Sequence, residues 1–105
     1  LLERLGTIFS DSSKEAIAHH FKFDYKILAR RGVQFGCRAF DTMIAHYLIQ
    51  PESSHKLDRL AETELGYATM PITDLIGKSG KDQKHMGQLD PASITDYACE
   101  DADIA

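Results

Sequence analysis

The sequence predicts a mainly α-helical polypeptide. An apolar stripe with helical spacing lies near the middle of the chain, at Phe40, Met43, Ile44, Tyr47 and Leu48. Boundary signals for further helices follow at Pro51, Gly66 and the Asp90-Pro91 pair. No alternating run of apolar and polar residues is long enough to predict a sheet.

Capping and stop signals predict the elements of the first half of the chain. Glycine is the usual helix stop, and a Ser followed three residues later by Glu is a capping box that starts a helix. An apolar run of three residues is too short for periodicity to distinguish strand from helix, so it predicts at most a brief strand. In order, we expect a helical end Leu1–Leu5 stopped by Gly6, a short helix begun by Ser12 and Glu15, a brief strand Ala16–Ala18, a helix Lys22–Arg31 stopped by Gly32, and a connector 32–36.

The second half contains the clearest helix, Asp41–Gln50. Asp41 precedes the apolar stripe and suits the N-cap, a role we prefer to that of an extra metal ligand. Pro51 ends the helix because proline disfavours helical backbone at the residue before it. After it we expect a helix capped by Ser54 with Leu57, Leu60, Ala61 and Leu65 inward and Gly66 as its stop, a short helix Ile72–Ile76, a polar loop 77–84, and a last helix from Pro91 or Ser93 to the end.

Composition limits the classes of function. The chain has 105 residues and a net charge of -4, with 43% hydrophobic and 27% charged residues, as in ordinary globular domains. No apolar run approaches the ~18 residues that a membrane span needs. The net negative charge argues against strong DNA binding by the chain alone. Cys37 and Cys99 have no metal-binding or redox spacing and are expected to be free thiols.

Tyr97 and Asp101 are the leading candidates for chemistry. They are four residues apart, which on a helix places both side chains on one face. A phenol beside a carboxylate, with Asp24 as a second carboxylate, suits a site that binds divalent metal and orients water. The structural alternative is a half-buried tyrosine and a surface acid on an amphipathic helix. Glu100, Asp101 and Asp103 make the helix end acidic, which is unfavourable at a C-terminus and indicates another use for the charge.

Other polar residues give weaker signals. The five histidines show no zinc-binding spacing. Lys78, Lys81 and Lys84 form a small basic loop that is either simply solvated or a phosphate contact. An acid at Asp24, in the first turn of its helix, is favoured by the helix dipole whether or not it has a chemical role.

Several stretches, in order, resemble the 3'-5' proofreading exonuclease domain of bacterial family A DNA polymerases. Each stretch alone is weak, but five in the family's order cover nearly the whole chain. They are Ala18–Asp24 with Ile27–Ala29, Ala39–Met43 with Tyr47-Leu48, His55–Glu62, Leu75–Lys78 and Tyr97–Asp103. The segment Ile76–Gln83 is similar to the polymerase version rather than to the related ribonuclease D type.

The resemblance implies an α/β fold of the ribonuclease-H-like class and hydrolysis of DNA at 3' ends with two Mg²⁺ or Mn²⁺ ions. Asp101 and Asp24 would be metal ligands, and Tyr97 would orient and help activate the attacking water. His20, Phe23, Lys78 and Lys81 would contact nucleic acid. His20 stands where the family usually has Asn. The implied partners are a single-stranded DNA 3' end and a polymerase domain of the same polypeptide, in the bacterial cytoplasm.

The family's first motif, Asp-x-Glu on a strand, is not found before Asp24; Asp11 and Glu15 are the weak substitutes there. We therefore expect residues 1–105 to be the C-terminal portion of one exonuclease domain of a larger polymerase. The fragment would be mainly helical, with weak or no metal binding and little or no activity. Its apolar stripes would be partly uncovered, which favours self-association.

Two other functions remain open from the sequence. One is a catalytically inactive exonuclease-like scaffold or DNA-end holder. The other is an exoribonuclease of the ribonuclease D type, which a parent without a polymerase domain would favour.

Overall fold

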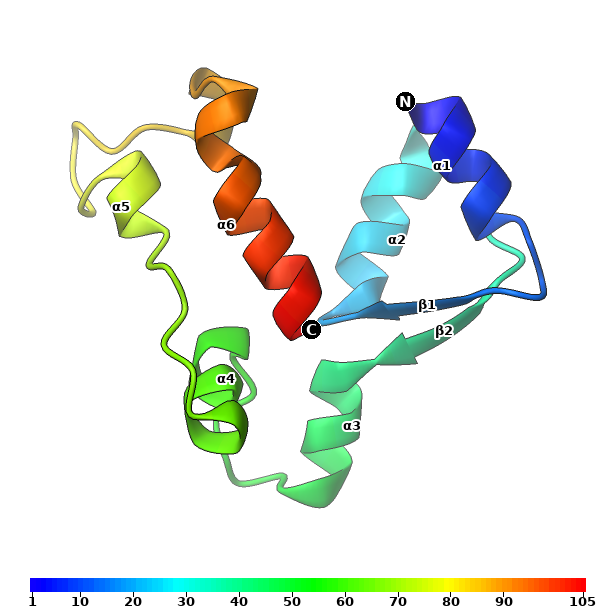
Figure 1. Cartoon of the computed structure of the whole chain (residues 1–105), viewed down its shortest axis with the longest axis horizontal. Coiled ribbons are helices and arrows are strands. Elements are labelled where there is room, and N and C mark those ends of the chain that lie inside the picture. Colours follow the sequence, from blue (N-terminus) through cyan, green and yellow to red (C-terminus); the bar gives the residue numbers. More distant parts are fainter. The chain divides into compact units, whose positions relative to one another are not determined.

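The computed structural model describes all 105 residues, and they form two compact units. The first unit contains Leu1–His55 and Ala105, and the second contains Lys56–Ile104; each is described by itself. No helix is long and apolar enough to cross a membrane. The elements are α1 Leu2–Phe9, β1 Glu15–Ala18, α2 Phe21–Arg30, β2 Arg38–Asp41, α3 Thr42–Ile49, α4 Leu57–Leu65, α5 Thr73–Ile76, the 3-10 helix η1 Met86–Gln88, and α6 Pro91–Ile104 (Figure 1).

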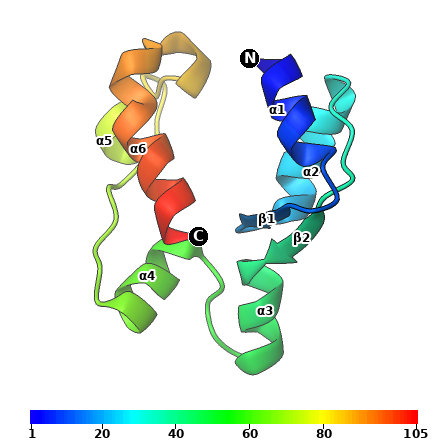
Figure 2. The same cartoon turned by 45° about the vertical axis from the view of Figure 1, so that its right-hand side comes forward.

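The first unit is a strand–helix–strand arrangement with additional helices. Strands β1 and β2 pair in parallel, with Glu15 opposite Arg38 and Ala18 opposite Asp41, and α2 makes the crossover between them. In Figures 1 and 2, α1 and α2 lie side by side next to the strand pair. An aromatic cluster packs between these elements, with ring-centroid distances of 4.9 to 6.3 Å, and consists of Phe9, Phe21, Tyr25 and Phe35.

The Asp41 carboxylate joins the starts of two helices. It lies at the end of β2 and caps α3, with Oδ1 accepting from the backbone N–H of Met43 at 2.9 Å and of Ile44 at 3.3 Å. The same carboxylate accepts from the N–H of His20 at 3.1 Å and of Phe21 at 2.8 Å, where α2 begins. The predicted N-cap is therefore confirmed, and one side chain satisfies four backbone donors.

Most predicted helices are confirmed within a residue or two. Helix α2 begins at Phe21 and is followed by Gly32 at φ 87°, and α4 ends at Gly66 at φ 64°. The short helix before Gly77, the loop 77–84 and the start of the last helix at Pro91 are confirmed as well. The brief strand at Ala16–Ala18 is confirmed as part of β1.

The expected helix stop at Gly6 is wrong, because α1 continues to Phe9. The backbone of Gly6 has no positive φ, and its carbonyl accepts from the Ser10 N–H at 3.0 Å as in any helix. A glycine inside a helix costs only about 1 kcal/mol relative to alanine. Packing of Phe9 against the aromatic cluster outweighs that cost.

The expected capping-box helix at Ser12 and Glu15 is also wrong. The Asp11 carboxylate accepts from both the N–H and the hydroxyl of Ser13, at 2.9 and 2.7 Å, and so forms a turn. The chain then enters β1 at Glu15, whose partner is β2. The sequence predicts no sheet, yet these two strands of four residues form one; they are too short to show alternation.

Ser54 is not the cap of α4. The N-cap residue is Lys56, which makes no side-chain capping bond. The chain just before it is fixed by histidines instead: the His55 carbonyl accepts from His19 Nε2 at 2.7 Å, and His55 Nδ1 lies 2.7 Å from His46 Nδ1. These bonds hold the end of the first unit to the residue that follows β1 and to α3.

Replacing Asp41 tests the shared cap. In Asp41→Ala the first unit should lose about 2 kcal/mol, as for loss of a strong N-cap, measured by hydrogen exchange of the α2 and α3 amides. Asp41→Asn is the matched variant: it keeps an acceptor for Met43 but loses the Phe21 bond, so its loss should be smaller. Equal protection in all three proteins would contradict the shared cap.

The pH dependence of this cap has a defined sign. Burial alone would raise the pKa of Asp41, but the backbone N–H groups of His20, Ile44, Phe21 and Met43 hold it below its usual range. A lowered folded-state pKa means that the stabilisation is complete above the unfolded pKa of about 3.9 and is lost as pH falls below it. The acid-induced loss should be absent in Asp41→Ala.

Gly36 allows a close approach between two backbone segments. A Cβ there would lie 2.4 Å from the Ser10 carbonyl oxygen, and the Gly36 N–H donates to the Phe9 carbonyl at 2.8 Å. Gly36→Ala should therefore destabilise the chain, whereas a Gly→Ala change at a site free of close contacts usually stabilises by about 0.4–1 kcal/mol. Gly6→Ala is the control: it meets nothing within 4 Å and should be stabilising. Urea unfolding of both variants distinguishes them, and a neutral Gly36→Ala would refute the close approach.

Candidate active site

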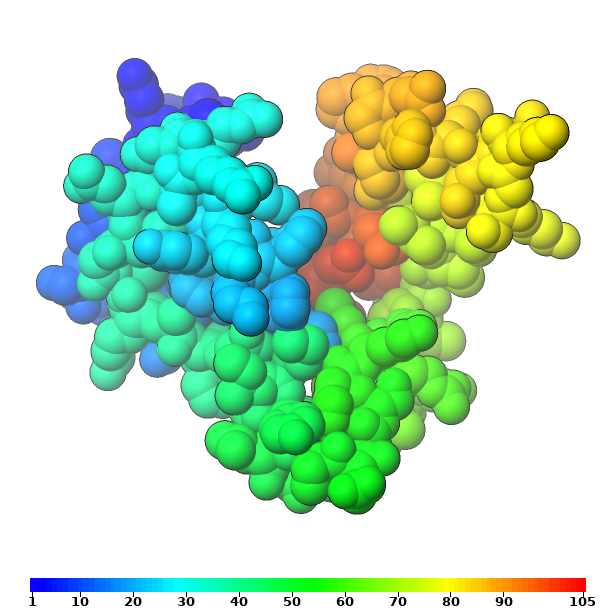
Figure 3. Space-filling view, turned by 180° about the vertical axis from the view of Figure 1, so that it is seen from behind, coloured from blue at the N-terminus to red at the C-terminus, as the bar shows by residue number.

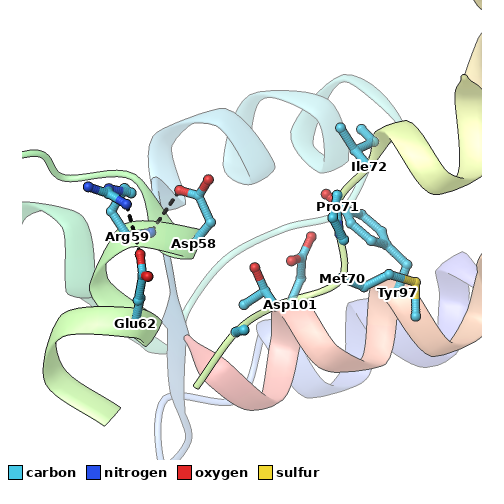
Figure 4. A pocket seen from close by; sticks show the side chains of 10 residues that line it. Asp58, Arg59, Glu62, Met70, Pro71, Ile72, Tyr97 and Asp101 are labelled. Atoms are coloured by element: carbon cyan, nitrogen blue, oxygen red, sulfur yellow. Dashed lines mark hydrogen bonds and ion pairs between the residues drawn. The ribbon is translucent and has the colours of Figure 1, made fainter. Parts of the chain in front are cut away.

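The second unit contains an open pocket of about 390 Å³. Helix α4, the segment that follows it and helix α6 supply its walls, and Figure 4 shows the side chains that they contribute. The lining residues are Asp58, Arg59, Glu62, Ala68, Thr69, Met70, Pro71, Ile72, Tyr97 and Asp101. Two of the three residues predicted for chemistry thus lie in one pocket, together with further acids that the sequence analysis did not select.

Tyr97 and Asp101 share one face of α6, as their spacing predicts, and both are half-buried. Burial raises the pKa of the Tyr97 phenol, and the charge of the neighbouring Asp101 carboxylate raises it further. Burial also raises the pKa of Asp101; the Tyr97 interaction opposes this rise, and the charge of Glu100 adds to it. The pair is therefore a protonated phenol beside a carboxylate of increased basicity.

Helix α4 contributes charges of both signs. Arg59 pairs with Glu62 at 2.8 Å, but both side chains are about 60% exposed, so this ion pair contributes little to stability. The Asp58 carboxylate accepts from the Arg59 N–H at 2.8 Å (Figure 4) and adds slightly to the rise in the Tyr97 pKa. The pocket therefore contains one basic side chain, Arg59, which is held only by a weak ion pair, and three carboxylates, Asp58, Glu62 and Asp101.

Glu100 fixes the segment that follows α4 and lines the pocket. Its Oε1 accepts from the Tyr67 hydroxyl at 2.7 Å and its Oε2 accepts from the Met70 N–H at 2.8 Å. The hydrogen bond to Glu100 raises the pKa of Tyr67. Sequence reasoning had identified the acidic helix end but not this role, because the donors are about 30 residues away in the chain.

Asp24 lies in the first unit, in the first turn of α2 as predicted. It borders a mainly apolar pocket of about 320 Å³ whose other lining residues are Phe9, Ala16, Ile17, Ala18, Phe21, Ile27, Leu28 and Phe35. Burial raises the pKa of Asp24, the charge of His20 lowers it, and the charge of Asp41 raises it again. No group of three or more His, Cys, Asp or Glu side chains is arranged to hold a metal ion.

His20 and Phe23 also belong to the first unit. His20 has a positive φ of 70°, unusual for a residue with a side chain, and forms the N-cap of α2. Its ring lies 6.0 Å from the Phe23 ring, and 58% of the Phe23 surface is exposed. An exposed aromatic ring beside an imidazole can stack on a nucleic-acid base.

Lys78 and Lys81 are exposed in the loop 77–84, which stands out in yellow in the space-filling view of Figure 3. The loop is closed by the Lys84 N–H, which donates to the Ile76 carbonyl at 2.9 Å, and by the Gln83 amide, which donates to the Gly77 carbonyl at 3.3 Å. The two lysines do not line the pocket that contains Tyr97 and Asp101.

Comparison with known proteins identifies the family of the chain. A family model described as 3'-5' exonuclease matches residues 1–105. The chain belongs to the 3'-5' exonuclease family. It is 36% identical to DNA polymerase I of Rhizobium leguminosarum over 98% of this chain, 36% identical to that of Borreliella burgdorferi over 99%, and 30% identical to that of Treponema pallidum over 99%.

The matched regions are 10%, 11% and 10% of those polymerases, so the chain spans about a tenth of their length. The resemblance stated from the sequence motifs is thereby confirmed, and the family is one of enzymes. The observed mixture of helices with a small parallel sheet is compatible with the expected α/β class.

The Tyr97–Asp101 interaction can be tested directly. In Asp101→Asn the Tyr97 pKa should fall toward the ordinary tyrosine value but stay above it, because burial persists when the neighbouring charge is removed. The measurement is a pH titration of the tyrosine Cζ resonances by NMR. Asp96→Asn is the control, since adjacent residues on a helix do not face each other. An unchanged Tyr97 titration in Asp101→Asn would show that the pair does not interact.

Proposed function

We propose that this chain is part of the proofreading exonuclease of a bacterial DNA polymerase I, which removes nucleotides from a single-stranded DNA 3' end. The observation that carries the proposal is the Tyr97–Asp101 pair in one pocket, in a chain that matches the exonuclease family end to end. These relatives are all DNA polymerase I, which supports DNA as the substrate and a polymerase domain as the neighbour.

In this proposal Tyr97 orients the attacking water. A phenol whose pKa lies above its ordinary value stays protonated at neutral pH, so it acts by hydrogen bonding through its hydroxyl and not as a phenolate base. Asp101, whose pKa burial raises, is the carboxylate that would hold a metal ion beside this phenol. Tyr97 would help to activate the water by orienting it through this hydroxyl.

The donor set suits Mg²⁺ or Mn²⁺. These ions prefer oxygen ligands, and Mg²⁺ is commonly bound by one or two carboxylates together with substrate phosphates. Asp101 offers such a carboxylate in the second unit, and Asp24 offers one in the first. When bound, two ions stabilise the attacking and leaving oxygens of an in-line displacement. With only these two acids assigned, we expect the chain alone to bind metal weakly and to be inactive.

Nucleic-acid contacts are assigned by chemistry. Phe23 with His20 offers a stacking surface for a base, and Lys78 and Lys81 offer charge to the DNA backbone. To these we add Arg59, which lines the pocket and is held only by an exposed ion pair with Glu62. Because such a pair is weak, a phosphate can replace Glu62 at little cost.

We also propose a fold, a cellular location and an association state for the protein. The fold is that of a ribonuclease-H-like domain of which residues 1–105 are the C-terminal portion, and the parent enzyme works in the bacterial cytoplasm. The isolated chain self-associates through uncovered apolar side chains. Supporting this, Leu48 and Ile49 of α3 are 77% and 75% exposed, and Val33 and Ala61 are the buried apolar residues.

The test uses the full-length polypeptide that contains this chain. With Mg²⁺ and a 3'-labelled single-stranded DNA, Asp101→Ala and Asp24→Ala should each lower exonuclease activity by roughly 100-fold or more, and Tyr97→Phe by a similar or smaller factor. Asp96→Asn is the matched control and should keep full activity. DNA polymerisation by every variant should be unchanged, which shows that the protein is folded.

Other outcomes favour the other functions. If the unmodified polypeptide binds 3' ends but cleaves none, the inactive scaffold is supported and the proposal fails. If it degrades RNA in preference to DNA, the ribonuclease D type is supported. If Asp101→Ala cleaves as fast as the unmodified protein, the assignment of the pocket is wrong.

A further inference from the structure

Glu100 makes two bonds to one segment of the chain. Each of its carboxylate oxygens has its own partner, the Tyr67 hydroxyl at 2.7 Å and the Met70 N–H at 2.8 Å. Hydrogen bonds to an ionised acceptor are roughly twice as strong as those between neutral groups. The four-residue stretch from Tyr67 to Met70 is therefore fastened to α6 at both ends.

The fastened stretch is also the wall of the pocket. Its residues Ala68, Thr69 and Met70 line the pocket that contains Tyr97 and Asp101, as do the following Pro71 and Ile72. Figure 4 shows Met70, Pro71 and Ile72 together with Tyr97 and Asp101. Proline has no N–H, so the Met70 N–H is the last backbone donor before the chain enters Pro71. The bond to Met70 thus fixes the position from which the rest of the wall continues.

The local chain geometry makes this anchor necessary. Helix α4 ends at Gly66, which has a left-handed backbone, and the Tyr67 N–H donates to the Ala61 carbonyl at 3.0 Å. From Ala68 to Ile72 the chain forms no helix or strand. The hydrogen bonds of Glu100 are the links from this irregular stretch to α6.

Glu100 also stands where its charge is otherwise unfavourable. It lies in the C-terminal part of α6, which has no basic residue in its last turn, and the helix dipole disfavours an acid there. Two charge-assisted hydrogen bonds offset that cost. An uncharged residue would avoid the penalty but could not accept both bonds.

We propose that Glu100 is a positioning residue that clamps the Tyr67–Met70 segment to α6 and thereby shapes the pocket around Tyr97 and Asp101. Glu100 itself does not touch the reacting atoms in this scheme. That the pocket receives a DNA 3' end rests on the proposed function, whereas the two hydrogen bonds of Glu100 do not depend on it. Loss of the clamp leaves both Tyr97 and Asp101 on α6 but releases the wall that they face.

The clamp is tested on the 105-residue chain by NMR. In Glu100→Ala the Met70 amide should exchange with solvent about tenfold faster, and the Tyr67 titration should shift to lower pH. Glu100→Gln keeps one acceptor oxygen, so it should restore Met70 protection while leaving the Tyr67 titration shifted. Asp96→Asn removes a charge from the same helix and should change neither signal. If Glu100→Ala matches Asp96→Asn in both signals, the clamp is refuted.

The consequence for the pocket is tested in the full-length polypeptide. Glu100→Ala should raise the KM for a single-stranded DNA 3' end about tenfold with kcat little changed, and Glu100→Gln should recover most of the loss. An unchanged KM would overturn the pocket-shaping role even if the NMR signals move. If the unmodified enzyme shows no exonuclease activity while the NMR signals move as expected, the proposed function fails and the clamp is upheld.

Discussion

The first unit depends on one carboxylate. Asp41 ends β2, caps α3 and receives the two backbone donors at the start of α2, so three elements meet at its oxygens. The strand pair is only four residues long, and short strands contribute few bonds of their own. The hydrogen bonds of Asp41, more than the pairing of the strands, therefore fix the position of β1 and β2 relative to α2 and α3. Asp24, in the first turn of α2, takes its position from the same junction.

Much of the fold follows from local signals, and the errors have a common cause. Helices with a clear stripe and a strong stop, such as α3 before Pro51 and α4 before Gly66, are predictable because each signal lies within one turn of its effect. The strand at Ala16–Ala18 was predicted, but β2 and its pairing with β1 were not, because the paired residues are 23 positions apart and each strand is too short to show a period. At Gly6 the stop signal was overridden by packing against distant aromatic side chains.

The same difference between local signals and distant partners applies to the candidate site. Tyr97 and Asp101 could be paired from the sequence, since their spacing of four residues fixes a common face wherever a helix forms. Asp58, Arg59 and Glu62 could not be placed beside them, because nothing in the sequence tells which face of α4 meets α6. The role of Glu100 was predictable only in part. An acid that opposes the helix dipole indicates that it has a partner, but the sequence does not show that this partner is the Tyr67–Met70 segment.

The charge on α6 links the stability of this helix to its proposed use. Glu100, Asp101 and Asp103 lie near its C-terminus without a basic residue in the last turn, and each acid there opposes the dipole. Glu100 is compensated by its two donors. Asp101 lies beside the Tyr97 phenol, and its pKa, raised chiefly by burial, reports the remaining cost of ionisation. A cation held at Asp101 would remove that cost, so a ligand that binds there also stabilises the helix that carries it. The pocket thus has an excess of negative charge, which a bound cation would neutralise.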